Sequence, residues 1–178
     1  MKLLTTLLVP LALAMPLAPV RAEDLGPYAI VAVGRTDYSF DCYYFSSCSS
    51  SRATGGKVVA GYRYGLFAVE GSYADWGKGS TPNYSDLGLR SLGVNGAWHM
   101  HFSPDVQGLL RAGFAQVWQS RSDAGGSSHL EGTFGLGLSV SMTSAVAVEL
   151  AWDATTSTGQ NIGSVLAQSL NAGLRLRF

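Results

Sequence analysis

The chain has 178 residues, of which 47% are hydrophobic and only 13% are charged, and its formal net charge at pH 7 is zero. The lack of excess positive charge argues against a nucleic-acid partner. After the first 22 residues no run of about 18 apolar residues occurs, so the sequence offers no membrane-spanning helix.

Residues 1–22 have the pattern of a secretory signal peptide. Lys2 precedes a long stretch rich in Leu, Ala, Val and Pro, and Val20 and Ala22 lie three positions and one position before a plausible cleavage site. A transmembrane anchor is the alternative, but prolines interrupt the stretch, which is also short for a membrane span. We therefore expect an exported chain with one mature domain, residues 23–178.

The mature sequence consists mainly of segments in which apolar and polar residues alternate. Side chains of a β-strand point to opposite faces in turn, so this period of two predicts strands. No segment of helical length shows a 3.6-residue period. Eight strands are predicted, at residues 27–37, 56–64, 66–76, 87–102, 106–119, 129–142, 145–154 and 165–178.

The connections between these strands alternate in length. Long polar segments follow the first, third, fifth and seventh strands, whereas tight turns follow the others, near Gly65, at 103–105 and at 143–144. In an up-and-down arrangement all long loops then lie at one end and both termini at the other. This asymmetry and the even strand number are typical of bacterial outer-membrane barrels. The predicted fold is an all-β, eight-stranded antiparallel up-and-down transmembrane β-barrel.

The first long connection contains two cysteines and several aromatic residues. Cys42 and Cys48 lie close together in an exported chain, which predicts a disulfide that closes a small surface loop. Exposed aromatic side chains here suit contact with a surface ligand or with lipopolysaccharide. Alternatively, some of them form an outer aromatic girdle with Trp76, Trp118 and Trp152. The candidate contact residues are Tyr38, Phe40, Tyr43, Tyr44 and Phe45.

The apolar face of the strands is expected to meet lipid. A secreted lipocalin-like carrier would instead turn it inward, but the polar face here is poor in charge and rich in small residues, which suits a narrow barrel interior. In the segment 87–94 the apolar positions change from odd, at Leu87 and Leu89, to even, at Leu92 and Val94. A β-bulge there is predicted to restore one consistent apolar face.

Charged residues of the polar face are expected to pair inside the barrel, because buried charges persist only when they are compensated. A structural plug of ion pairs is favoured over a gate or a proton path. His99 and His101 share this face, but two histidines alone make a weak metal site, so polar filling is favoured. The predicted lumen charge network consists of Arg63, Glu70, Arg111, Glu149 and Arg175.

The strand "GPYAIVAVGRTDY", the eight-strand layout and the final "GLRLRF" resemble the small OmpA-like and opacity-type outer-membrane β-barrel proteins. The resemblance spans roughly residues 24–178. It implies that Leu174, Leu176 and Phe178 form the signal that the outer-membrane assembly machinery reads. It also implies a location in the outer membrane of a Gram-negative bacterium, among outer-membrane lipid and lipopolysaccharide.

The sequence leaves three classes of function open. The first, which we favour, is a structural or surface-interacting, adhesion-like barrel with an occluded lumen, because eight strands enclose little space beyond their own side chains. The second is a narrow porin-like channel for small solutes, and the third is a lipid-modifying enzyme. Because neighbouring Ser103 and His101 in a turn do not form a triad, no enzymatic activity is expected. No cofactor is expected either, and the barrel is expected to be a monomer.

Overall fold

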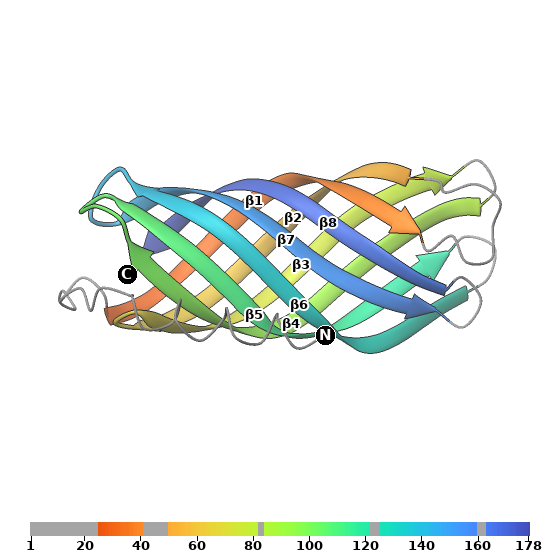
Figure 1. The fold of residues 1–178 in the computed structure, drawn as a ribbon, viewed down its shortest axis with the longest axis horizontal. Helices are drawn as coiled ribbons and strands as arrows, with labels where there is room; N and C mark the ends of the chain where they lie inside the picture. The colour runs from red at the N-terminus through yellow and green to blue at the C-terminus, as the bar shows by residue number, and fades with distance from the viewer. Residues whose placement is uncertain (1–24, 41–49, 82–83, 122–124, 160–162) are drawn as a thin grey trace, which may run out of the picture.

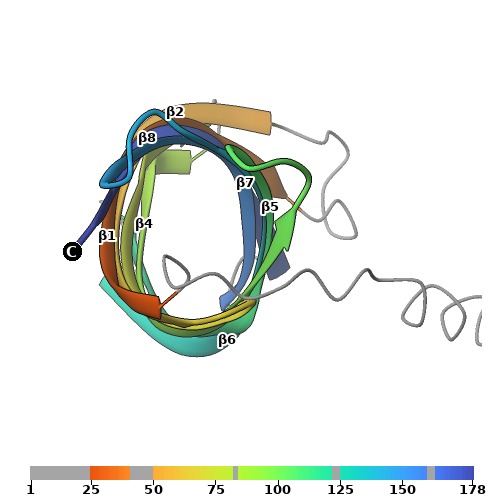
Figure 2. The same cartoon turned by 90° about the vertical axis from the view of Figure 1, so that its left-hand side faces the viewer.

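The computed structural model describes residues 25–40, 50–81, 84–121, 125–159 and 163–178. Antiparallel strands pair in chain order, and β1 pairs with β8 to close the barrel (Figures 1 and 2). The predicted eight-stranded up-and-down barrel is thus confirmed. None of the described residues forms a helix of the length and hydropathy that a membrane crossing requires. The strands are β1 Leu25–Phe40, β2 Ser50–Tyr64, β3 Phe67–Thr81, β4 Tyr84–His101, β5 Val106–Arg121, β6 Gly125–Ser141, β7 Val146–Gly159 and β8 Gly163–Arg177.

The strands extend further towards the long loops than the sequence predicted. β2 begins at Ser50 instead of residue 56, and β7 continues to Gly159 instead of residue 154. These extensions are rich in Gly, Ser and Thr and do not alternate in polarity, but hydrogen bonds between neighbouring backbones need no particular side chain. The predicted tight turns are confirmed, and Gly65 supplies the left-handed backbone of the first with a φ of +64°.

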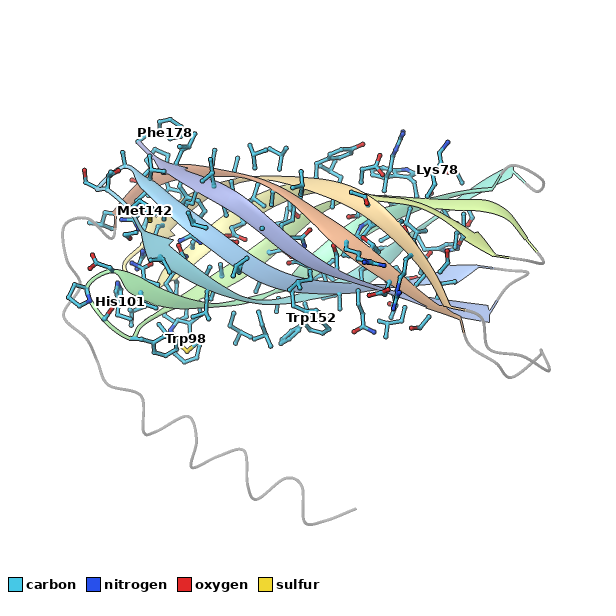
Figure 3. All side chains as sticks on the ribbon, turned by 90° about the horizontal axis from the view of Figure 1, so that it is seen from above. Lys78, Trp98, His101, Met142, Trp152 and Phe178 are labelled. Carbon is cyan, nitrogen blue, oxygen red and sulfur yellow. The ribbon has the colours of Figure 1, made fainter. Side chains whose placement is uncertain are left out.

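Over most of the wall, large apolar side chains point outward and small or polar side chains point inward. Figure 3 shows Trp98, Trp152 and Phe178 on the outside of the barrel. Val94 and Phe114 are 63% and 68% exposed, as expected for residues that face lipid rather than water. The outward position of the apolar face was predicted.

Towards the loop end the two faces exchange their polarity. The interior there is an apolar cluster, and the outer surface carries exposed ion pairs between Arg52 and Asp37 and between Arg90 and Asp75, each with a nitrogen–oxygen distance of 3.1 Å. This end of the wall is built like a water-soluble barrel. The inner apolar cluster consists of Tyr38, Ala53, Ala74, Trp76, Leu87, Leu89, Ala115, Val117, Val165 and Ala167.

The exchange of polarity explains the odd and even apolar positions of β4, and the predicted bulge there is wrong. Leu89 is fully buried inside the barrel whereas Leu92 is 55% exposed outside it, and pairing of β4 with β5 is regular through this segment. The pairing of β3 with β4 is irregular instead, with register shifts between Asp75 and Lys78 and between Gly79 and Thr81. Because the environment of each face changes along the strand, the apolar pattern of β4 changes parity without any change of its register with β5.

We expect Leu89→Ala to lower the free energy of unfolding by about 2–5 kcal/mol, because it leaves a cavity among rigid neighbours. Leu92→Ala is the matched control, with an expected loss of about 2 kcal/mol from the transfer of the side chain alone, because fluid lipid fills the space and leaves no cavity. Urea unfolding of both variants in phospholipid vesicles measures the difference. Equal losses would contradict the exchange of polarity.

A charged cluster inside the barrel

Four charged side chains meet across the lumen from four different strands. Arg111 of β5 places its Nε 2.7 Å from Oε2 of Glu70 on β3, and its Nη1 2.9 Å from Oε1 of Glu149 on β7. Arg175 of β8 completes the cluster, with its Nη2 2.6 Å from Oε2 of Glu149. None of these side chains is more than 4% exposed. The cluster therefore extends across the interior with alternating charges.

Two aromatic side chains, those of Tyr28 and His99, lie beside the cluster. The hydroxyl of Tyr28 donates a hydrogen bond to Oε1 of Glu70, and the Arg175 guanidinium carbon lies 5.0 Å from the centre of the Tyr28 ring. His99 is fully buried, with Nδ1 3.5 Å from Nη1 of Arg175. Gly61 makes room for Tyr28, because a Cβ at Gly61 would lie 2.6 Å from the ring. These contacts hold the charged groups in place.

A second ion pair lies nearer the loop end and was not predicted as a pair. Lys57 and Asp153 are 2.5 Å apart, and Asn171 Nδ2 donates a hydrogen bond of 2.7 Å to the same carboxylate oxygen of Asp153. Lys57 lies two residues before Val59, whose side chain points inward. The two-residue period of a strand could therefore have placed Lys57 on the interior face. A cavity of about 40 Å³ separates this pair from Arg111, which is room for a buried water.

Arg63 belongs to the turn end of the barrel and not to the four-residue cluster. Its Nε donates to the carbonyl oxygen of Gly65 at 2.7 Å, its Nη1 donates to Gln107 at 3.0 Å, and its Nη2 lies 3.3 Å from Nε2 of His101. Arg63 also lines a cavity of about 200 Å³ at the mouth of the barrel, together with Arg177. The structure thus brings together four of the five predicted network residues and separates the fifth.

The two histidines are each next to an arginine, and positive charge opposes a metal cation. Within the described ranges, no three His, Cys, Asp or Glu side chains are grouped so that they could hold a metal ion. What the cluster can do chemically is compensate buried charges between strands on opposite sides of the lumen.

One predicted surface contact is wrong. Tyr38 is fully buried inside the barrel, where its hydroxyl donates to the carbonyl oxygens of Trp76 and Gly77 at 3.0 and 2.9 Å. Trp76 likewise points inward, with Nε1 2.9 Å from Ser91 Oγ, so it is no part of an outer girdle. Both positions follow from the exchange of polarity. Cys42, Cys48, Tyr43, Tyr44 and Phe45, and the side chain of Phe40, lie outside the described residues.

The last strand presents its apolar residues on the outer surface at the turn end. Leu174, Leu176 and Phe178 are 52%, 40% and 78% exposed. The backbone nitrogen of Phe178 donates to the carbonyl oxygen of Pro27 at 3.1 Å, so the end of β8 is attached to the beginning of β1. Figure 3 shows Phe178 projecting from the barrel at the end where His101 and Met142 lie.

Comparison with known proteins places this geometry in context. The family model described as "Outer membrane protein beta-barrel domain" matches residues 4–178. Neisserial surface protein A is similar in structure, with 21% identity and a TM-score of 0.68 over 86% of this chain and 97% of that one. The N-terminal β-barrel domain of Pseudomonas aeruginosa OprF has 18% identity and a TM-score of 0.53 over 85% and 98%. None of the curated proteins matches the sequence.

Proposed function

The chain belongs to the outer membrane protein beta-barrel domain family, and we propose that it is a structural or surface-interacting barrel with a closed lumen. It lies in the outer membrane as an eight-stranded transmembrane barrel. The proposal rests on one observation: the buried chain of Glu70, Arg111, Glu149 and Arg175 crosses the interior. The apolar cluster around Leu89 fills the lumen above it.

The proposed surface role is supported by cationic side chains on the outside of the barrel at its loop end. Arg35, Arg52, Lys78 and Arg90 are exposed on the outside of β1 to β4, next to the level where lipid ends. Cationic side chains at this level suit the phosphate groups of lipopolysaccharide. We further propose that the barrel acts as a monomer without enzymatic activity, and that Cys42 and Cys48 form a disulfide.

Planar-bilayer recording tests the closed lumen. We expect no steady conductance from the purified protein, because the ion pairs leave no continuous path for a solute. Glu149→Ala is the informative variant, since it removes the acceptor shared by Arg111 and Arg175 and should introduce brief, small openings. A stable open channel of the unmodified protein would establish the narrow-channel alternative instead.

A further inference from the structure

The mouth of the barrel at the turn end contains a cavity of about 200 Å³ that is lined with positive charge. Arg63 of β2 and Arg175 and Arg177 of β8 contribute to its wall. Among the described residues that line this cavity, none has an Asp or Glu side chain. Guanidinium groups around one cavity repel one another, so a carboxylate between them would stabilise the arrangement. The cavity therefore has the charge of an anion site.

The arginines of this cavity are shielded from water. Arg63 is 5% exposed and Arg175 is 1% exposed. Arg175 has a carboxylate partner in Glu149, but its Nε is buried without a hydrogen-bond partner among the described residues. Because charges interact more strongly away from water, an anion in the cavity would be bound more tightly than one at an exposed arginine.

The first strand begins beside this cavity. Leu25, Gly26 and Pro27 all line it, and Gly26 has a φ of +137°, which departs from regular strand geometry. β1 pairs with β2 on one side, where Gly26 lies opposite Arg63, and with β8 on the other. Figure 1 shows the start of β1 and the end of β8 at the same end of the barrel. The chain that precedes Leu25 therefore joins the barrel between the two strands that carry the arginines.

Two acidic residues, Glu23 and Asp24, directly precede Leu25 in the sequence. They lie outside the described residues. Because one residue spans at most about 3.6 Å, this segment cannot lead further than roughly 7 Å from Leu25, which itself lines the cavity. The volume of the cavity is several times the roughly 30 Å³ share of one water molecule, so there is room for a carboxylate side chain. The sequence thus supplies negative charge next to a positively charged cavity.

We propose that the acidic segment 23–24 binds in this cavity and caps the turn end of the barrel through ion pairs with Arg63 and Arg177. A carboxylate that is tethered so closely has an effective concentration of millimolar order or more, which favours it over dissolved anions. These contacts attach the beginning of the chain to both neighbours of β1. The inference goes beyond the closed lumen proposed above, which depends on the four-residue cluster.

Removal of the two carboxylates tests the proposal. The test variant is Glu23→Ala with Asp24→Asn, and Asp105→Asn is the matched control, because Asp105 is an exposed acid between β4 and β5 that does not line the cavity. Urea unfolding in phospholipid vesicles should give an unfolding equilibrium constant about tenfold larger for the test variant, as expected for lost charge-assisted hydrogen bonds. The control should leave this constant nearly unchanged. Intact-mass measurement checks that all proteins begin at the same residue.

A second substitution locates the contact. In an Arg177→Gln background, the effect of the test variant should shrink to about threefold or less, because the effects of residues in contact are not additive. An equal effect in both backgrounds, or no effect in the unmodified background, would overturn the proposal.

Inorganic phosphate distinguishes the acidic segment from a dissolved anion as the occupant. At constant ionic strength, phosphate should stabilise the test variant, whose cavity has lost its carboxylates, and leave the unmodified protein unchanged. Equal stabilisation of the unmodified protein would assign the cavity to an external anion and overturn the proposal. Planar-bilayer recording of the test variant should still show no steady conductance, because the four-residue cluster is intact. The closed lumen is thus judged separately from the binding of segment 23–24.

Discussion

Arg111→Met is expected to lower the free energy of unfolding by about 3–5 kcal/mol, because it leaves buried carboxylates without their shared partner. Arg111 bridges Glu70 and Glu149, and all three side chains are nearly inaccessible to solvent. Glu149 retains Arg175, so the larger penalty falls on Glu70, whose remaining partner is the Tyr28 hydroxyl. Urea unfolding in phospholipid vesicles measures this change.

Two further variants separate loss of charge compensation from loss of packing. Glu70→Gln combined with Arg111→Met removes the uncompensated carboxylate, so it should be more stable than Arg111→Met alone. Arg90→Met breaks an exposed pair with Asp75 and should cost about 0–1 kcal/mol. If Arg111→Met and Arg90→Met had the same small effect, the lumen cluster would contribute little to stability.

Deletion of Phe178 is expected to reduce sharply the amount of protein in the outer membrane while the purified variant still refolds in detergent. The ring is 78% exposed on the outer surface, so its burial in the lipid interface contributes at most about 1.5–3 kcal/mol. A closed barrel tolerates that loss because its strand pairing remains. The proposed role of Phe178 in the assembly signal accounts for the larger effect in cells.

Quantitative blotting of outer-membrane fractions and detergent refolding of the same variant measure the two contributions. Arg177→Ala is a suitable control, because Arg177 points inward and donates to Ser141 Oγ at 2.8 Å. It should leave outer-membrane levels close to normal. Normal levels of the Phe178 deletion would remove the signal role, and failure of that deletion to refold would attribute the loss to instability.

The strand number, the order of pairing and the outer face could be predicted because they depend on a local period of two and on loop lengths. Interior charges could be predicted as a group from their parity, but their pairing could not. Arg63 and Arg175 share that parity, yet barrel tilt places Arg63 at the mouth and Arg175 beside Glu149. Such cross-lumen distances depend on the stagger of distant strands, which no local pattern contains.

The loop end was less predictable because the rule that apolar side chains point outward and polar ones inward does not hold along the whole strand. Tyr38 and Trp76 are large aromatic residues in polar surroundings, a pattern that suggested surface exposure. In the structure they fill the interior at the level where the outer surface becomes charged. Recognising this from sequence requires knowing where the membrane ends on each strand.

The exchange of polarity divides the barrel into two parts with different stabilising contacts. The part nearer the turns has lipid outside and ion pairs inside, whereas the part nearer the long loops has its own apolar interior around Leu89. The strand ends at the loop end are therefore supported by an interior of their own, and not only by the part of the wall that faces lipid.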